Sequence, residues 1–144
     1  MTNLRNLLIL LARAGIGVVF LAHGWQKFVT NGLDATQRGF ESMGAPLPGI
    51  SAILATAVEL AGGAGLILGA ITPVWAVLLV ADMVGAYLIT HMGNGLFVTS
   101  GGGELVIGLG AGALLLLCTG AGRFSVDGLL ADRAPWNRPG FVPA

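Results

Sequence analysis

Ionisable residues stand inside long apolar stretches of the sequence, where a membrane-spanning helix would hold them away from water. Arg13 lies in the first stretch, Glu59 in the second and Asp82 in the third. A charge at the bilayer centre costs roughly 3 kcal/mol or more, so such residues face a protein interior and find partners there. Counting residues along antiparallel helices places all three at one level. One cation beside two carboxylates predicts a catalytic proton relay or a buried ion network.

A second group of polar side chains lies nearer one end of the same stretches. His23 and Lys27 are four residues apart and share a helix face, while His91 ends the third stretch and Glu104 begins the fourth. Such groups beside apolar walls predict a binding site for the polar headgroup of a lipid-soluble molecule. Asp82 and His91 are nine residues apart and would face opposite ways on a straight helix. Either the third helix ends or bends before His91, or one of these two residues lies outside the site.

The composition is that of an integral membrane protein. Of 144 residues, 55% are hydrophobic and 10% are charged, whereas soluble domains carry about 25% charged residues. The net charge is zero and no basic run occurs, so nothing indicates nucleic acid as a partner. The single cysteine, Cys118, leaves no intramolecular disulfide and no cysteine-rich metal site, and we predict no bound metal.

The apolar stretches predict an all-α membrane bundle, because about 20 apolar residues suffice to cross a bilayer. A polar connection at 29–48 is expected to form a short interfacial helix near 34–43, with Phe40 and Met43 on one side. The distribution of basic residues predicts a multi-pass protein with both termini in the cytoplasm. We expect a domain at 1–128, a polar C-terminal tail at 129–144, and helices at about 5–28, 50–70, 73–91 and 102–119.

A short internal repeat suggests that the bundle consists of two related helical hairpins. The segment ELAGGAG at 59–65 resembles ELVIGLG at 104–110, with the acid, the leucine and two glycines in register. Glycines also let membrane helices approach closely, which gives the same pattern a purely structural explanation.

Several motifs, in their order and spacing, resemble the DoxX family of small four-helix membrane proteins. They are AR at 12–13, FLAHGWQK at 20–27, VELAGG at 58–63, His91 before a glycine-rich loop, GEL at 103–105 and GAGRFSVD at 120–127. The resemblance implies four transmembrane helices, a location in the plasma membrane and association with oxidoreductases. Members of the family are linked to thiosulfate-to-quinone electron transfer and to oxidative stress. The resemblance implies no agreed set of catalytic residues.

We therefore expect an integral membrane subunit of an oxidoreductase system, quinone-interacting and linked to thiol, sulfur or oxidative-stress redox chemistry. No flavin, nicotinamide or iron–sulfur motif is visible, so electrons would come from a partner redox protein. Three other functions stay open. They are a non-catalytic scaffold that recruits soluble redox enzymes, a small-solute or proton transporter acting as a homo-oligomer, and a metal or haem site. The metal would be held by two histidines and two carboxylates from different helices, and the haem by His23 and His91.

Each candidate residue also has a structural explanation. The ionisable groups at 13, 59 and 82 would then form an ion network that only specifies helix packing. The two histidines would bond to loop carbonyls, and Lys27 would extend to the membrane surface among the lipids. The sequence does not decide whether the chain is itself a catalyst.

Overall fold

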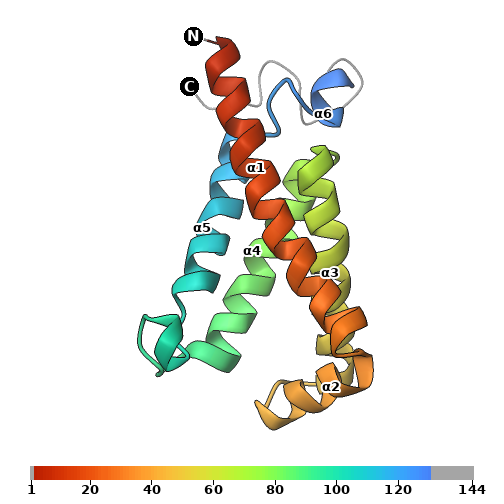
Figure 1. Cartoon of the computed structure of the whole chain (residues 1–144), viewed down its shortest axis with the longest axis vertical. Coiled ribbons are helices and arrows are strands. Elements are labelled where there is room, and N and C mark those ends of the chain that lie inside the picture. The colour runs from red at the N-terminus through yellow and green to blue at the C-terminus, as the bar shows by residue number, and fades with distance from the viewer. Residues whose placement is uncertain (1, 131–144) are drawn as a thin grey trace.

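The computed structural model describes residues 2–130, which form a bundle of long helices with no strand among them (Figure 1). The predicted all-α membrane bundle is confirmed. Segments Asn3–Thr30, Pro48–Leu68 and Thr72–His91 are long and apolar enough to cross a membrane, and Glu104–Thr119 is a shorter apolar helix. The elements are α1 (Thr2–Trp25), η1 (Gln26–Thr30), α2 (Leu33–Ser42), α3 (Pro48–Leu68), α4 (Thr72–Ala86), η2 (Tyr87–His91), η3 (Val98–Ser100), α5 (Glu104–Thr119) and α6 (Val126–Leu129).

The fourth long helix, α5, has 16 residues. At 1.5 Å per residue it is about 24 Å long, somewhat less than the hydrocarbon core of a bilayer. It begins later than the predicted 102–119 because the preceding loop turns at Gly101, whose φ is +79°. Of the predicted polar tail at 129–144, all but the first two residues lie outside the described part of the chain.

The helices pack most extensively in two pairs, α1 with α3 and α4 with α5, and α3 also packs on α4. Glycines bring the first pair close together. A Cβ atom added to Gly17 would lie 2.8 Å from the carbonyl oxygen of Gly63, and the reverse holds for Gly63. Such close approach of backbones is typical of membrane helices, which have no hydrophobic drive to associate. The buried apolar core comprises Phe20, Leu66, Leu79, Met83, Val106, Ala113 and Leu116.

The turn between α3 and α4 is held by the start of α6. Asp127 accepts hydrogen bonds from the backbone N–H groups of Ile71, at 2.7 Å, and Thr72, at 2.9 Å. A carboxylate is favourable at a helix N-terminus. Ile71 has a φ of +54°, which is a costly conformation for a β-branched residue. The carboxylate therefore stabilises both the first turn of α4 and the strained residue before it.

Arg13 belongs to the same end of the bundle. Its guanidinium donates hydrogen bonds to the carbonyl oxygens of Leu66, at 2.6 Å, Ile67, at 3.0 Å, and Phe124, at 2.8 Å. The side chain is 1% exposed. A cation is favourable at the carbonyls of Leu66 and Ile67 because they lie at the C-terminal end of α3. Arg13 thus ties α1 to α3 and to the loop before α6.

The prediction that Arg13 shares a level with Glu59 and Asp82 is therefore wrong. The cause is the register of the antiparallel pair α1 and α3. A Cβ atom on Gly24 would contact the backbone of Glu59 and Leu60, so Glu59 lies beside Gly24. Gly24 is eleven residues beyond Arg13, which is about 16 Å along a helix.

Candidate functional site

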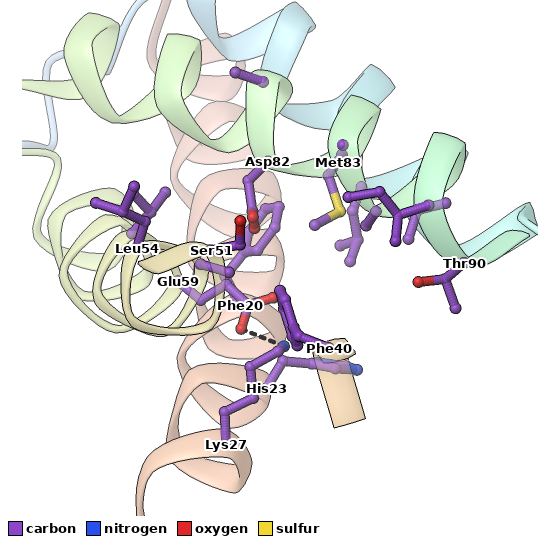
Figure 2. Close-up of a pocket in the computed structure, with 18 of the residues that line it drawn as sticks. Phe20, His23, Lys27, Phe40, Ser51, Leu54, Glu59, Asp82, Met83 and Thr90 are labelled. Carbon is purple, nitrogen blue, oxygen red and sulfur yellow. Dashed lines mark hydrogen bonds and ion pairs between the residues drawn. The ribbon is translucent and has the colours of Figure 1, made fainter. Parts of the chain in front are cut away.

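A pocket of about 650 Å³ lies between the two helix pairs, next to α2 (Figure 2). Its volume is in the range typical of small-molecule sites. Every long helix contributes to the wall, together with η2 and the end of α2. Most of the lining side chains are apolar. The polar and ionisable ones are His23, Lys27, Ser51, Glu59, Asp82, Thr90 and His91.

An ion pair joins α3 to η1 within this pocket. Lys27 Nζ lies 2.6 Å from Glu59 Oε2, and the two side chains are 22% and 5% exposed. A lysine near the end of a membrane helix ordinarily extends toward the surface, where its ammonium is hydrated. Here the ammonium reaches inward to Glu59 instead, so the pair is partly shielded from solvent. Removing either partner would leave the other as a buried charge without compensation.

Asp82 lies opposite this ion pair. The short turn between α3 and α4 sets the two helices in register, so that Gly62 packs against Leu79 and Glu59 stands level with Asp82. Figure 2 shows the Asp82 side chain pointing from α4 toward Glu59 and the Lys27 ammonium. Among the described residues, Asp82 Oδ2 is buried and has no hydrogen-bond partner. Glu59 and Asp82 thus stand level with each other, and the cation bonded to Glu59 is Lys27 instead of the predicted Arg13.

Both histidines line the pocket and hold their rings by Nδ1. His23 Nδ1 donates to the carbonyl oxygen of Val19 at 2.9 Å, and His91 Nδ1 donates to that of Gly101 at 2.7 Å. A carbonyl oxygen only accepts, so Nδ1 carries a proton in each ring. In the neutral ring, Nε2 is therefore the acceptor. The bond of His91 to a loop carbonyl is the one expected from the structural explanation, and it leaves Nε2 unused.

A π-helical turn explains how Asp82 and His91 reach one pocket. The α-helical geometry of α4 ends at Ala86, and Tyr87–His91 forms the wider turn η2. Each residue of a π-helix turns through a smaller angle about the helix axis than a residue of an α-helix does. His91 therefore does not face directly away from Asp82, as it would on a straight α-helix. Lys27 lies in the other π-helical segment, η1. Segments of this kind are frequent at functional sites.

Glu104 does not belong to the pocket. Its Oε1 accepts a hydrogen bond from the backbone N–H of Val98, at 2.7 Å, and so fixes the loop before α5. The pocket instead includes residues that the predicted site omitted. Phe40 and Met43 come from the predicted interfacial helix, and the Thr90 hydroxyl contacts Met43 Sδ at 3.3 Å, which links η2 to the end of α2. The sequence does predict that Phe40 and Met43 lie on one side of this helix, and that pattern could have placed them in the site.

No three side chains of histidine, cysteine, aspartate or glutamate within residues 2–130 gather closely enough to hold a metal ion. The described part of the chain thus contains no cluster on which to base the metal alternative. The charged groups of the pocket are the Lys27–Glu59 ion pair and the Asp82 carboxylate. These groups are suited to bind a polar organic group or a proton.

Comparisons with known proteins agree with this architecture. The family model described as DoxX matches residues 8–92. The chain is 30% identical to the inner membrane protein YphA of Escherichia coli over 85% of its own length and 90% of that protein. It is 33% identical to the uncharacterized membrane protein Rv3486 of Mycobacterium tuberculosis, over 83% and 78% of the two chains.

A third relative has a name that mentions an activity. Over 55% of this chain and 56% of the relative, the sequence is 35% identical to "Putative oxidoreductase CatD" of Bacillus subtilis. No solved structure matches the chain. The family model covers more than half of the sequence, and the helices are those of a membrane protein. The chain is a membrane protein of the DoxX family.

Proposed function

We propose that this protein is the membrane subunit of an oxidoreductase system and that its pocket binds a quinone headgroup. One observation carries the proposal: the partly buried ion pair of Lys27 and Glu59 stands beside Asp82 in a pocket whose walls are mostly apolar. Ionisable groups inside a membrane are costly and are functional by default. The relative named as an oxidoreductase adds support for redox chemistry.

The residues of the pocket fit a quinone. Phe20, Met83 and Val106 supply apolar walls for the ring. The Lys27 ammonium has three N–H donors, of which the bond to Glu59 uses one, so others remain for a quinone carbonyl. His23 Nε2 and the free oxygen of Asp82 are acceptors for the hydroxyl groups of the reduced form.

The pocket also reaches the outer surface of the bundle between α3 and α4. Leu54 and Leu78 line it and are 58% and 39% exposed. Exposed apolar side chains of membrane-spanning helices face lipid. A lipid-soluble molecule can therefore enter sideways from the bilayer, with its tail left among the acyl chains.

A bound quinone would supply two-electron redox chemistry, with the electrons exchanged with a partner protein. The chain's own contribution is to hold the ring, to place the Lys27 ammonium near a carbonyl oxygen, and to move protons. Glu59 and Asp82 are placed to take up or release those protons. We also propose that the protein lies in the plasma membrane with both termini in the cytoplasm. The two ends of the described chain lie at the same end of the bundle, opposite α2 (Figure 1).

The variant Glu59→Gln tests this function. Its amide keeps the shape of the side chain but neither attracts Lys27 by charge nor accepts a proton, so we expect the dissociation constant of a short-tailed quinone to rise at least about tenfold. Equilibrium dialysis of radiolabelled quinone against the detergent-solubilised protein measures this constant. Glu104→Gln is the matched control, since Glu104 lies outside the pocket, and it should bind as the unaltered protein does. Equal affinity in the Glu59 variant would refute the proposal.

A further inference from the structure

The charges around the pocket do not balance. Lys27 contributes one positive charge and is paired with Glu59 at 2.6 Å. Asp82 contributes a second carboxylate, and its buried Oδ2 has no hydrogen-bond partner among the described residues. With both acids ionised and both histidines neutral, the pocket carries one surplus negative charge. A carboxylate in such surroundings is stabilised by a proton or by another cation.

The remaining elements around Asp82 do not cancel this charge. The pocket linings from α2 and α5 are apolar. The other titratable groups that line the pocket are His23, Lys27, Glu59 and His91. Glu104, at the start of α5, lies outside the pocket and accepts a hydrogen bond from the backbone N–H of Val98. Each histidine becomes positive only when it takes up a proton.

We propose that the pocket binds a lipophilic monovalent cation, such as an aryl-substituted phosphonium or ammonium, in exchange for the proton on Asp82. One cation enters and one proton leaves, so the charge of the site is unchanged. The apolar walls accept the hydrophobic groups of the cation, and the rings of Phe20 and Phe40 are suited to face its positive charge. The exposed apolar residues between α3 and α4 give such a ligand a path from the bilayer. This inference is independent of quinone binding, because it depends only on the charges of Lys27, Glu59 and Asp82 and on the shape of the pocket.

Isothermal titration calorimetry with tetraphenylphosphonium tests the inference on the detergent-solubilised protein. We expect saturable binding that weakens as the pH falls, because protons compete with the cation for Asp82. In Asp82→Asn the dissociation constant should rise by roughly tenfold or more, with a smaller dependence on pH. This variant should fold, since it removes a carboxylate that makes no hydrogen bond through its buried oxygen.

Two further measurements separate charge recognition from simple partitioning into the pocket. Triphenylphosphine oxide, which is neutral, should bind more weakly than the phosphonium. Lys27→Met should bind the phosphonium more tightly than the unaltered protein, because both carboxylates then lack a cation. Absence of saturable binding, or equal binding by the Asp82→Asn variant at every pH, would overturn the inference. A quinone that still binds in that case would leave the proposed function standing.

Discussion

Gly85→Trp is expected to weaken ligand binding in the pocket while leaving the bundle intact. Gly85 lines the pocket from α4, and a Cβ atom added there would meet nothing within 4 Å. The indole would therefore extend into the space that a ligand needs. The ligand must then displace the indole or bind in the space that remains, so the dissociation constants of quinone and phosphonium should both rise roughly tenfold to hundredfold.

The fold should survive because no neighbour has to move at the Cβ position. Glycine is also among the poorest helix formers, so its replacement in α4 does not weaken the helix. Gly108→Trp is the matched control: it lies in α5 outside the pocket, and its added Cβ is equally free of contacts. Both variants should show the same thermal unfolding in detergent, and only the first should lose affinity. Unchanged affinity in Gly85→Trp would mean that the ligand binds elsewhere.

Lys27→Met should be the most destabilising substitution in the site. It leaves Glu59, whose side chain is 5% exposed, as a buried carboxylate without its partner. Breaking a buried ion pair from one side costs about 3–5 kcal/mol, and the lower part of that range is expected here because Lys27 is partly exposed. Thermal unfolding followed by circular dichroism measures the loss.

The double variant Lys27→Met with Glu59→Gln should recover most of that stability, since no unpaired charge remains. It should nevertheless bind quinone weakly, because the Lys27 donor and the Glu59 carboxylate are both gone. This combination separates the two roles of the pair. A double variant as unstable as Lys27→Met alone would show that the pair stabilises the bundle by more than charge compensation.

The helices of this protein and part of its site could be predicted from the sequence. Long apolar runs determine where the helices lie, because few other structures satisfy the backbone inside a membrane. The level shared by Glu59 and Asp82 also follows from the chain, since only three residues separate α3 from α4 and leave the register little freedom. The chain therefore fixes the two carboxylates at one level but does not specify the cation beside them.

The identity of that cation could not be predicted. A long connection that includes α2 joins α1 to α3, so the chain itself does not fix their register. The close approach at Gly17 and Gly63 fixes it instead, and this contact places Arg13 at the carbonyls of α3. The inward reach of Lys27 depends on the same register and on the π-helical turn η1, for which the sequence has no recognised signal. Glu104 was assigned by its position in the chain, and its bond to Val98 depends on the loop conformation.

Photolabelling with an azidoquinone, followed by mass spectrometry of the peptides, is the most direct test of the quinone site. We expect labels on the pocket-facing residues of α3 and α4, near Glu59 and Asp82. The labels should decrease when unlabelled quinone competes and in Gly85→Trp. Labels confined to outward-facing residues of α5 such as Leu114 and Leu115, with no effect of competitor, would contradict it.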